Sequence, residues 1–510
     1  MSLQDRIRLE SGLLRRKGGS WKGGITRRTG DRSYAPLSFA QERMWFMDQM
    51  SPDVPLYNVA WATRLIGAVD ADALERALRR LGERNEVLRT VYEADEGLPR
   101  QHILPRPSIP LHRIDLPDGE GIGIRDRDAQ ATRIIEREAL QGFDLTTDPV
   151  LRATLIRVAE RDHMLLFVAH HIALDGWSRA IFHQELAAQY ERELRGDESP
   201  MPEASVQYGD FAFWQRSEAQ CEMIGSKLAY WRKKLDGLAP TLDLPIQQID
   251  PERSTHEGSE IPFRIAPAVV DRLNTLARKH GATPFMVLAT AVNVLLYRYT
   301  GETDLAIGTP VAGRTTTESE SLVGLFVNTL VLRTDLRDGP SFEQAVERVR
   351  AVCLEAYEHQ QVPFEQIVAA LGKERVIDRP PIVQVMVAYR TFPSVPLQLA
   401  ETSAEDVEIP MSTSKLDLSF ELWNTDQGMS GRLIYTKHRF RESKMKALAA
   451  HFVSIVESGC RQPQTRIAKL PMLSIEEREQ VIYRWNESGT TPAAERLVPV
   501  SYTHLRAHET

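Results

Sequence analysis

The sequence predicts an α/β protein with two lobes, and three observations lead to this prediction. Its 510 residues exceed what one ordinary hydrophobic core holds. Apolar patterns of helical and of strand period alternate along the chain. A Pro- and Ser-rich stretch at residues 195–205 interrupts them. Because helices and strands interleave on both sides of this gap, we expect an N-terminal lobe over residues 34–205 and a C-terminal lobe over residues 206–480.

The N-terminal lobe is expected to begin with a helix in residues 35–50, which Ser38 is suited to cap. Its helical spacing is carried by Phe39, Arg43, Trp45 or Phe46, and Met50. Three further elements follow: a helix that starts at Asp70 and turns into a strand by residue 93, an apolar strand at 163–172, and a helix at 178–194 with Ile181, Phe182, Leu186, Tyr190 and Leu194 on one face.

The C-terminal lobe is expected to contain long helices. The predicted elements are helices at 207–236 and 267–300, a strand at 304–313, a helix near 341–359, a mixed strand and loop region to about 437, and a closing helix at 442–459. The most apolar run, residues 285–297, includes Thr290 and Asn293 and is shorter than the about 20 residues that span a bilayer. We therefore expect a buried helix there and no membrane partner.

The two ends differ from the rest of the chain. Residues 1–33 hold nine Lys or Arg and three Asp or Glu, which indicates a basic linker or docking segment. Residues 481–499 have the composition of a linker. Residues 500–510 continue no pattern and resemble a translated transposase-type sequencing adapter, so we exclude them from fold reasoning and expect the natural polypeptide to continue.

Composition narrows the class of protein. The hydrophobic fraction of 42% and the charged fraction of 26% are those of a soluble globular protein. A net charge of −7 argues against nucleic-acid binding by the whole chain. Three distant cysteines, Cys221, Cys353 and Cys460, argue against a disulfide framework and against a cysteine metal site. Together with the absence of a signal-peptide pattern at Met1, they predict a reducing, cytoplasmic setting.

Two adjacent histidines form the most informative stretch, "AHHIALDGWS" at residues 169–178. Side chains of neighbouring strand residues point to opposite faces, so His170 and His171 cannot do the same job. One is expected to lie in the core while the other faces a cavity. Asp175 follows in the turn, where it can orient an imidazole or pair with an arginine, and Gly176 permits close approach of a substrate.

A single histidine on an apolar strand is more often a core residue than a catalytic one. The pair followed by Asp175 and Gly176 in one strand-to-turn segment reverses that preference and predicts a catalytic site. A zinc site is disfavoured, because the two rings lie on opposite faces and no other ligand spacing is present. A serine nucleophile is not predicted, because no G-x-S-x-G elbow is present. A phosphate-binding loop is not predicted either, because "GTPVAG" lacks the Gly-Lys-Ser/Thr ending.

The segment "HHIALDG" matches the HHxxxDG pattern and resembles the condensation domains of nonribosomal peptide synthetases, within the chloramphenicol-acetyltransferase-like superfamily. Further motifs of that family occur in order over roughly residues 34–480: "LSFAQERMWFMDQM", "RNEVLRT", "YGDFAFW", "VGLFVNTLVLR", "HQQVPFE", "RVIDRPPIVQ" and "TSKLDLSF". Departures are Asn85 for the usual His, Gln361 for the usual Asp, and a partial fit at 378–380. They bear on substrate preference more than on activity.

The resemblance implies two chloramphenicol-acetyltransferase-like lobes in a V-shaped pseudo-dimer with a tunnel between them. It implies an acyltransferase that forms a peptide bond between donor and acceptor thioesters. Both substrates are carried on the 4'-phosphopantetheine of peptidyl carrier domains, with no cofactor or metal bound directly. An adenylation domain is expected downstream, beyond residues 481–499. The opening and HHxxxDG segments resemble the type that takes an L-configured donor.

The resemblance also assigns roles to residues. His171 acts on the acceptor amine, either as a general base or as a positioning group, and both roles stay open. Asp175 pairs with an arginine, with Arg84 as first candidate, and Gly176 offers its N–H to an oxyanion. His170 is expected to be a core residue. Structural or tunnel-lining roles fall to Arg43, Arg84, Arg89, Trp214 and Asn328, with Asn328 placed equally between substrate contact and backbone bridging, and Lys415 and Asp417 are expected to be structural.

Other functions remain open at this point. A starter condensation domain would join a fatty acyl donor to the first amino acid, and the basic leader would then face coenzyme A or an acyl carrier. An epimerisation domain shares HHxxxDG, but "FVNT" and "HQQVPFE" favour condensation. A non-catalytic recruitment domain is disfavoured because both histidines, Asp175 and Gly176 are present. A heterocyclising domain is excluded, because such relatives have Asp in place of the histidines and this chain has His170 and His171.

Overall fold

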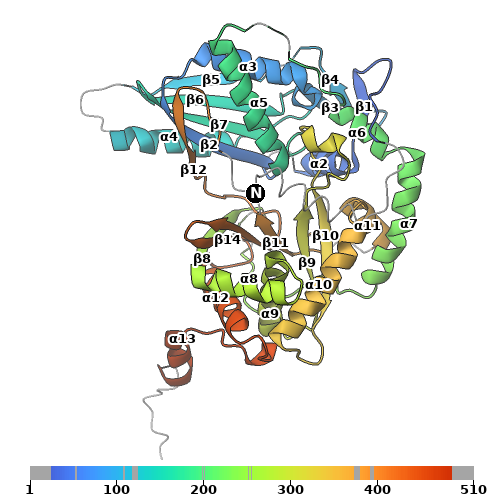
Figure 1. Cartoon of the computed structure of the whole chain (residues 1–510), viewed down its shortest axis with the longest axis vertical. Helices are drawn as coiled ribbons and strands as arrows, with labels where there is room; N and C mark the ends of the chain where they lie inside the picture. The colour runs from blue at the N-terminus through green and yellow to red at the C-terminus, as the bar shows by residue number, and fades with distance from the viewer. Residues whose placement is uncertain are drawn as a thin grey trace, which may run out of the picture.

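The chain is described here from a computed structural model that covers residues 24–484, apart from residues 52–53, 107–108, 118–123, 198, 200, 251, 254–255, 373–379 and 391–395. Its described part contains three β-sheets and two large hydrophobic cores (Figure 1). The predicted α/β class is confirmed.

The C-terminal core lies on a six-stranded mixed sheet. Its strand order is β10 (Asn328–Asp335), β9 (Asp304–Val311), β11 (Val385–Arg390), β13 (Leu418–Thr425), β14 (Gly428–Thr436) and β8 (Gly258–Ile265). Helices pack on it and on one another: α8 (Pro267–Lys279), α9 (Pro284–Thr300), α10 (Phe342–Glu358) and α12 (Glu442–Arg461). Helix α9 is buried on all sides at most of its positions, as the apolar run predicted.

The N-terminal core lies on a five-stranded sheet. Its order is β12 (Thr402–Val407), β2 (Asn58–Gly67), β7 (Asp162–His170), β6 (Leu151–Ala159) and β5 (Leu111–Asp115). A three-stranded sheet of β1 (Tyr34–Pro36), β4 (Leu98–Ile103) and β3 (Thr90–Asp95) adjoins it. The accompanying helices are α2 (Phe39–Met50), α3 (Ala71–Arg84), α4 (Ile124–Ala139) and α5 (Gly176–Leu194), with the short η1 (Glu86–Arg89).

The two cores do not divide at residue 205. Strand β12, from the second half of the chain, pairs antiparallel with β2 at the edge of the N-terminal sheet (Figure 1). Helix α6 (Tyr208–Gln215) buries Tyr208 and Phe211 in the N-terminal core. Leu322 and Phe326 belong to the same core. The predicted lobes at 34–205 and 206–480 are therefore interleaved, because long-range strand pairing leaves no mark in the local pattern.

Two predicted long helices are each broken into two. Residues 207–236 form α6 and α7 (Glu218–Lys234), separated at Ser217, which is the N-cap of α7. Residues 267–300 form α8 and α9, which are bent by 104° at the break. Gly281 adopts a φ of +58° there, and Thr283 caps α9 ahead of Pro284. Within the described residues no single helix is long and apolar enough to span a membrane; only the bent α8–α9 pair passes by length and composition.

The first predicted helix is α2, and its capping residue is confirmed. The Ser38 hydroxyl accepts a hydrogen bond from the Gln41 N–H, and the Gln41 side chain accepts one from the Ser38 N–H. The predicted apolar face is wrong, since Phe46 and Met50 are exposed while Gln41 and Met44 are buried. Helix α2 contacts α11 (Phe364–Leu371) and lies where the two cores meet, so polar side chains find partners on its buried side.

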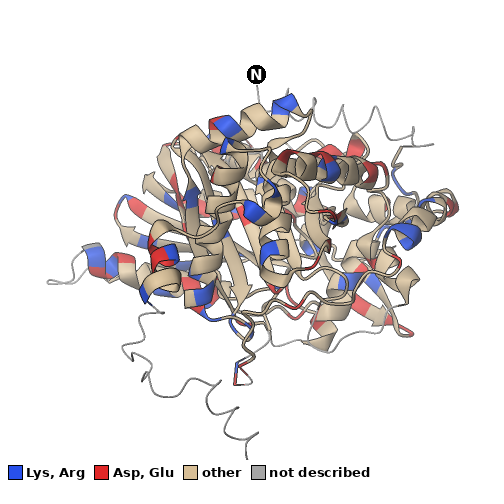
Figure 2. Ribbon diagram, turned by 90° about the horizontal axis from the view of Figure 1, so that it is seen from below, with Lys and Arg blue, Asp and Glu red and all other residues tan. Residues whose placement is uncertain are grey.

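The basic N-terminal segment is structured where it is described. Ile25 is buried in the N-terminal core, and the Arg28 guanidinium donates to Glu86 at 3.0 Å. Residues 24–33 therefore pack on the N-terminal core and are not a free linker, while residues 1–23 of the predicted linker or docking segment lie outside the described part. At the other end, α13 (Ile475–Glu479) and η4 (Gln480–Arg484) are helical, and residues 485–510 lie outside. Figure 2 shows basic and acidic residues interspersed along the described ribbon.

Candidate active site

The two histidines lie at the end of the central strand β7. His170 is its last residue and pairs with Asn58 of β2, and His171 begins the turn that leads to α5. Their environments differ as the alternation of strand side chains predicted. His170 is 4% exposed, whereas His171 is half-buried. Only His171 is therefore accessible to a substrate.

His170 is held as a neutral core residue. Its Nδ1 accepts a hydrogen bond from the Ile172 N–H at 3.2 Å. Its ring meets Tyr57 and Phe143 edge to face, with centroids 6.3 and 6.1 Å away. Burial, followed by the nearby charges of His171 and Lys415, lowers its pKa to about 3. With Nδ1 as an acceptor, the proton of the neutral ring resides on Nε2.

His171 is also neutral at physiological pH. Its backbone N–H donates to the Tyr57 carbonyl oxygen at 2.8 Å, which fixes the turn against β2. Burial and then the positive charge of Lys415 lower the pKa of its imidazole to about 4, although Asp175 opposes the shift. Its Nδ1 is buried with no hydrogen-bond partner among the described residues. The ring is thus an uncharged, incompletely satisfied hydrogen-bonding group.

Asp175 is a buried anchor. It caps α5 by accepting from the Ser178 N–H at 2.7 Å, and its other oxygen accepts from the Phe326 N–H at 3.0 Å. Arg314 donates to it at 3.2 Å. Burial alone would raise the pKa of Asp175, but the Arg314 charge and these N–H donors outweigh burial and lower it. The carboxylate stays ionised and holds the loop that follows His171.

The arginine partner predicted for Asp175 was wrong. Arg84 donates instead to Glu185 at 2.8 Å and to the Pro202 carbonyl oxygen. It ends helix α3 and faces the middle of α5, almost three turns beyond Asp175. Asn85, a departure from the family motif, donates to the same Glu185 at 2.9 Å. Both residues are structural in this arrangement.

Arg314 clasps the segment 314–326 beneath the start of α5. It donates to the carbonyl oxygens of Ser319 and Leu322 and to the Ser178 hydroxyl at 2.8 Å. Its guanidinium lies 4.1 Å from the centre of the Phe326 ring, and its side chain is 1% exposed. No sequence pattern pointed to it: the preceding segment "GTPVAG" was considered only as a phosphate-binding loop, and Arg314 lies just after that segment.

Gly176 opens the N-terminus of α5 toward free space. It is exposed, and no atom lies within 4 Å of where a Cβ would stand. The N–H groups of a first helical turn have no partner within their helix. The predicted oxyanion role of Gly176 fits this opening and remains a prediction.

A group of cationic side chains adjoins His171 across Tyr57. Arg43 on α2 adjoins the Tyr57 side chain and forms an ion pair with Glu365 of α11 at 3.1 Å. Lys415 places its Nζ 5.1 Å from the centre of the Tyr57 ring. Lys415 was expected to be structural, but it is exposed and carries a charge that acts on both histidines. Asp417 is structural as expected, since it forms a buried ion pair with Arg439 at 3.2 Å.

Asn328 bridges backbone groups. Its Nδ2 donates to the Gln360 and Val362 carbonyl oxygens at 2.9 and 2.8 Å, and its Oδ1 accepts from the Phe364 N–H at 3.0 Å. The structure thus favours the bridging alternative over substrate contact. Asn328 and Trp214 also line a small cavity of about 50 Å³. Gln361, a motif departure on the same cavity, accepts from the Lys227 ammonium at 2.7 Å.

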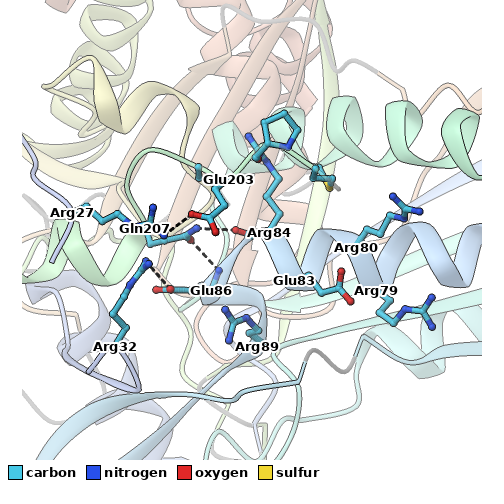
Figure 3. Close-up of a pocket in the computed structure, with 13 residues that line it drawn as sticks. Arg27, Arg32, Arg79, Arg80, Glu83, Arg84, Glu86, Arg89, Glu203 and Gln207 are labelled. Atoms are coloured by element: carbon cyan, nitrogen blue, oxygen red, sulfur yellow. Dashed lines mark hydrogen bonds and ion pairs between the residues drawn. The ribbon is translucent and has the colours of Figure 1, made fainter. Parts of the chain in front are cut away.

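Arg84 and Arg89 line a different cavity of about 530 Å³, shown in Figure 3. Its charged residues are Arg27, Arg32, Arg79, Arg80, Glu83, Arg84, Glu86, Arg89 and Glu203. Neither histidine lines it, so Arg84 and Arg89 are not brought to the candidate site. Ion pairs occupy much of its charge: Arg27 meets Glu203 at 2.7 Å, and Arg32 meets Glu86 at 2.8 Å. Arg89 donates to the Leu104 carbonyl oxygen.

No metal centre is apparent in the part of the chain that the structure covers. No three or more His, Cys, Asp or Glu side chains there are arranged to hold an ion. The three cysteines are all free, and Cys353 and Cys460 are buried. The candidate site therefore provides a neutral imidazole, that of His171, beside the open space at Gly176.

The chain is similar to known proteins over most of its length. The family model for the condensation domain matches residues 31–482. A linear gramicidin synthase of Brevibacillus parabrevis is 41% identical over 460 residues, which are 90% of this chain and 9% of that protein. Phosphinothricin tripeptide synthetase PhsC of Streptomyces viridochromogenes is 36% identical over 89% of this chain and 42% of its own length. The chain thus spans a minor part of these relatives.

Solved structures agree in fold. The X-domain from teicoplanin biosynthesis superposes with a TM-score of 0.80 at 27% identity, over 88% of this chain and all of that one. The first condensation domain of the calcium-dependent antibiotic synthetase superposes with a TM-score of 0.68 at 22% identity, over 87% of this chain and all of that one. The expected chloramphenicol-acetyltransferase-like fold is confirmed.

Proposed function

The chain belongs to the condensation-domain family of nonribosomal peptide synthetases, and from that premise we propose that it joins a donor acyl or aminoacyl thioester to the α-amine of an acceptor aminoacyl thioester. The observation that carries the proposal is His171: a neutral, half-buried imidazole at a strand end, in a turn anchored by Asp175, beside the open space at Gly176. A rigid strand aims the ring, and the turn gives access to it.

The reaction exchanges one bond for another. The acceptor nitrogen attacks the donor carbonyl carbon, a C–N bond forms and the C–S bond breaks. The proton lost by the amine leaves with the donor thiol. The nucleophile is the uncharged amine, so the site has to hold the amine in that form and stabilise the oxyanion of the tetrahedral intermediate.

The pKa of about 4 favours a positioning role for His171. An α-ammonium group has an ordinary pKa near 8. Transfer of its proton to such an imidazole would therefore be uphill by about 5 kcal/mol. A neutral ring instead accepts a hydrogen bond from the amine and directs its lone pair at the thioester. Holding the two substrates in line then supplies much of the rate enhancement.

Asp175 and Gly176 serve the same geometry. The Asp175 carboxylate ties the His171 turn to α5 and to the segment clasped by Arg314, so it acts through position rather than by contact with substrate. The Gly176 N–H is proposed to donate to the oxyanion, which the positive end of helix α5 favours. Removal of one such donor costs a typical enzyme about 10²–10³-fold in rate.

The partners follow from the family. We propose peptidyl carrier domains that present both thioesters on 4'-phosphopantetheine, and an adenylation domain downstream. An L-configured donor is proposed from the likeness of the opening and histidine segments to that type. No cofactor is proposed to bind to the domain directly.

The test uses two carrier domains, one loaded with an aminoacyl donor and one with an aminoacyl acceptor. We expect dipeptidyl carrier from the wild-type protein and a rate lowered about 10²-fold in His171→Ala, as for the loss of a positioning group. His112→Ala, on the exposed face of β5, is the matched control and should react at the wild-type rate. Inversion at Cα on one carrier, without need of the second, would favour epimerisation. Reaction only with a fatty acyl donor would favour a starter domain.

A further inference from the structure

Lys415 reaches the wall of the candidate site from the opposite half of the chain. It lies in the segment before β13, where Ser414 and Thr413 pair with His256 and Glu257, the two residues that precede β8. Its Nζ lies over the ring of Tyr57, whose carbonyl oxygen holds the His171 N–H. Its side chain is exposed. The ammonium group is therefore presented to the same accessible space as His171.

The charge of Lys415 is not cancelled locally. Among the described residues, no carboxylate forms an ion pair with its Nζ. Asp48 lies on the far side of the histidine pair, next to His170, and its pKa is raised to about 6. The three other acids around the site have partners of their own. Glu421 is bound by Arg390 at 2.6 Å and by Arg432 at 2.9 Å.

The other two acids are also engaged. Glu365 pairs with Arg43, and Asp175 pairs with Arg314. Arg43 and Lys415 both adjoin Tyr57, so the space beside His171 has a positive potential.

This potential is visible in the titrating groups around the site. Crowding by protein, followed by the charge of Arg43, lowers the pKa of Lys415 to about 8, so it is mostly cationic at pH 7. Its charge in turn lowers the pKa of His170 and of His171. An amine that enters the same space meets the same repulsion when it is protonated.

We propose that Lys415 is a positioning residue whose uncompensated charge selects the neutral, nucleophilic form of the acceptor amine at the site; this rests on the function proposed above. Two unit charges about 10 Å apart interact, at an effective dielectric constant near 20, strongly enough to lower the pKa of the bound amine by about one unit. Near neutral pH this raises the reactive fraction up to about tenfold. The effect requires charge and not the ability of Lys415 to take up a proton.

The first experiment compares single-turnover amide formation at saturating acceptor carrier between pH 5.5 and 9.5. In Lys415→Met the acid limb of the rate–pH profile should move up by about one pH unit. The rate of amide formation should then be about tenfold below wild type at pH 6 and equal to wild type near pH 9. Lys415→Arg keeps the charge and should restore the wild-type limb. Lys437→Met, which removes a lysine paired with Glu257 at 3.1 Å, should leave the limb in place.

An unchanged acid limb in Lys415→Met would overturn the proposal. The proposal would also be overturned if Lys415→Arg folds but has the same rate–pH profile as Lys415→Met. That result would mean that Lys415 acts as a proton acceptor and not through its charge. Thermal melting of each variant separates loss of fold from loss of charge.

The second experiment needs no activity. Nuclear magnetic resonance of ¹⁵N-histidine protein, with His171 assigned through His171→Asn, should show the His171 titration midpoint rising by about half a unit or more in Lys415→Met and staying low in Lys415→Arg. Equal midpoints in all three proteins would contradict the charge coupling. A wild-type protein that forms no amide at any pH would overturn the proposed function alone, and this titration would still decide on the charge of Lys415.

Discussion

The fold holds the ionisable side chain of Asp48, on α2, next to His170, and this placement lowers the stability of the folded state. Its Oδ1 lies 3.9 Å from His170 Nε2, and its side chain is 12% exposed. Burial is the main cause that raises its pKa to about 6, with a contribution from Asp144. His170 is neutral and gives Asp48 no ion pair at pH 7. The ionised carboxylate therefore destabilises the folded state.

We expect Asp48→Asn to be more stable than wild type at neutral pH. The pKa of Asp48 is higher in the folded protein than in the unfolded chain, so the folded state binds the extra proton between about pH 6 and pH 4. The penalty is complete above pH 6 and vanishes as the pH falls through this window. Unfolding by urea should give an advantage of about 1–2 kcal/mol for the variant at pH 7.5, shrinking toward zero by pH 4.5.

Asp144→Asn is the control with the opposite sign. Hydrogen bonds from Thr146 and Thr147 lower the pKa of Asp144, so its contribution to stability is present above the unfolded pKa and is lost as the pH falls. Its replacement should destabilise the protein at neutral pH. An Asp48→Asn protein that is less stable than wild type at pH 7.5 would show that the carboxylate is compensated by a contact.

At the scale of elements, the segment 314–326 is the support on which the start of α5 rests. The Gly324 carbonyl oxygen accepts from the Ser178 hydroxyl at 2.8 Å and from the Asp175 N–H at 3.3 Å. A Cβ at Gly324 would stand 1.9 Å from the ring of Tyr208. Tyr208 cannot yield easily, because it is fully buried and its hydroxyl is bonded to the Leu325 carbonyl oxygen and to Ser38.

Gly324→Ala should therefore displace the segment from α5. Overpacking of this kind costs about 1–3 kcal/mol, and the rate of amide formation should fall because the Asp175 anchor shifts with it. Gly225→Ala is the matched control: Gly225 lies inside α7 with no atom within 4 Å of the place that an alanine methyl would take, so alanine should stabilise the helix by about 0.5–1 kcal/mol. Thermal melting and amide formation are the measurements. A Gly324→Ala protein with wild-type melting and rate would contradict the role of this contact.

How far the sequence predicts these elements depends on how local their signals are. The strand before His171, the cap at Ser38 and the helix after Gly176 follow from periodicity and capping, and all three are confirmed. The break between α8 and α9 also has local signals, namely Gly281 and the cap Thr283 ahead of Pro284. The prediction of one continuous helix gave more weight to the apolar periodicity than to these signals. Contacts made across more than a hundred residues had no such signal.

At the scale of the whole molecule, those distant contacts decide the architecture. Arg314 and Lys415 reach the His171 region from the second half of the chain; the sequence carried no signal for Arg314, and Lys415 was expected only to be structural. Strand β12 is short and polar, with no feature that names β2 as its partner. The family resemblance supplied the overall fold, whereas the residue that holds Asp175 became apparent only when tertiary structure placed it there.

The interleaving of the two cores predicts that the first half of the chain cannot fold alone. A fragment of residues 24–205 lacks β12, so the edge of β2 from Ala62 to Gly67 loses its partner. It also lacks α6 and residues 322–326, which fill the N-terminal core. We expect a poorly dispersed proton spectrum and no cooperative unfolding transition, whereas residues 24–484 should give both dispersion and a sharp transition. A dispersed, cooperatively unfolding 24–205 fragment would show that the segments from the second half only cover a core that is already complete. In that case the remaining residues, supplied in trans, should restore the anchor of Asp175.

The turn that carries His171 should not be fixed in the isolated 24–205 fragment, because the fragment lacks Arg314, the buried partner of Asp175. The amide protons of this turn should therefore exchange rapidly with solvent.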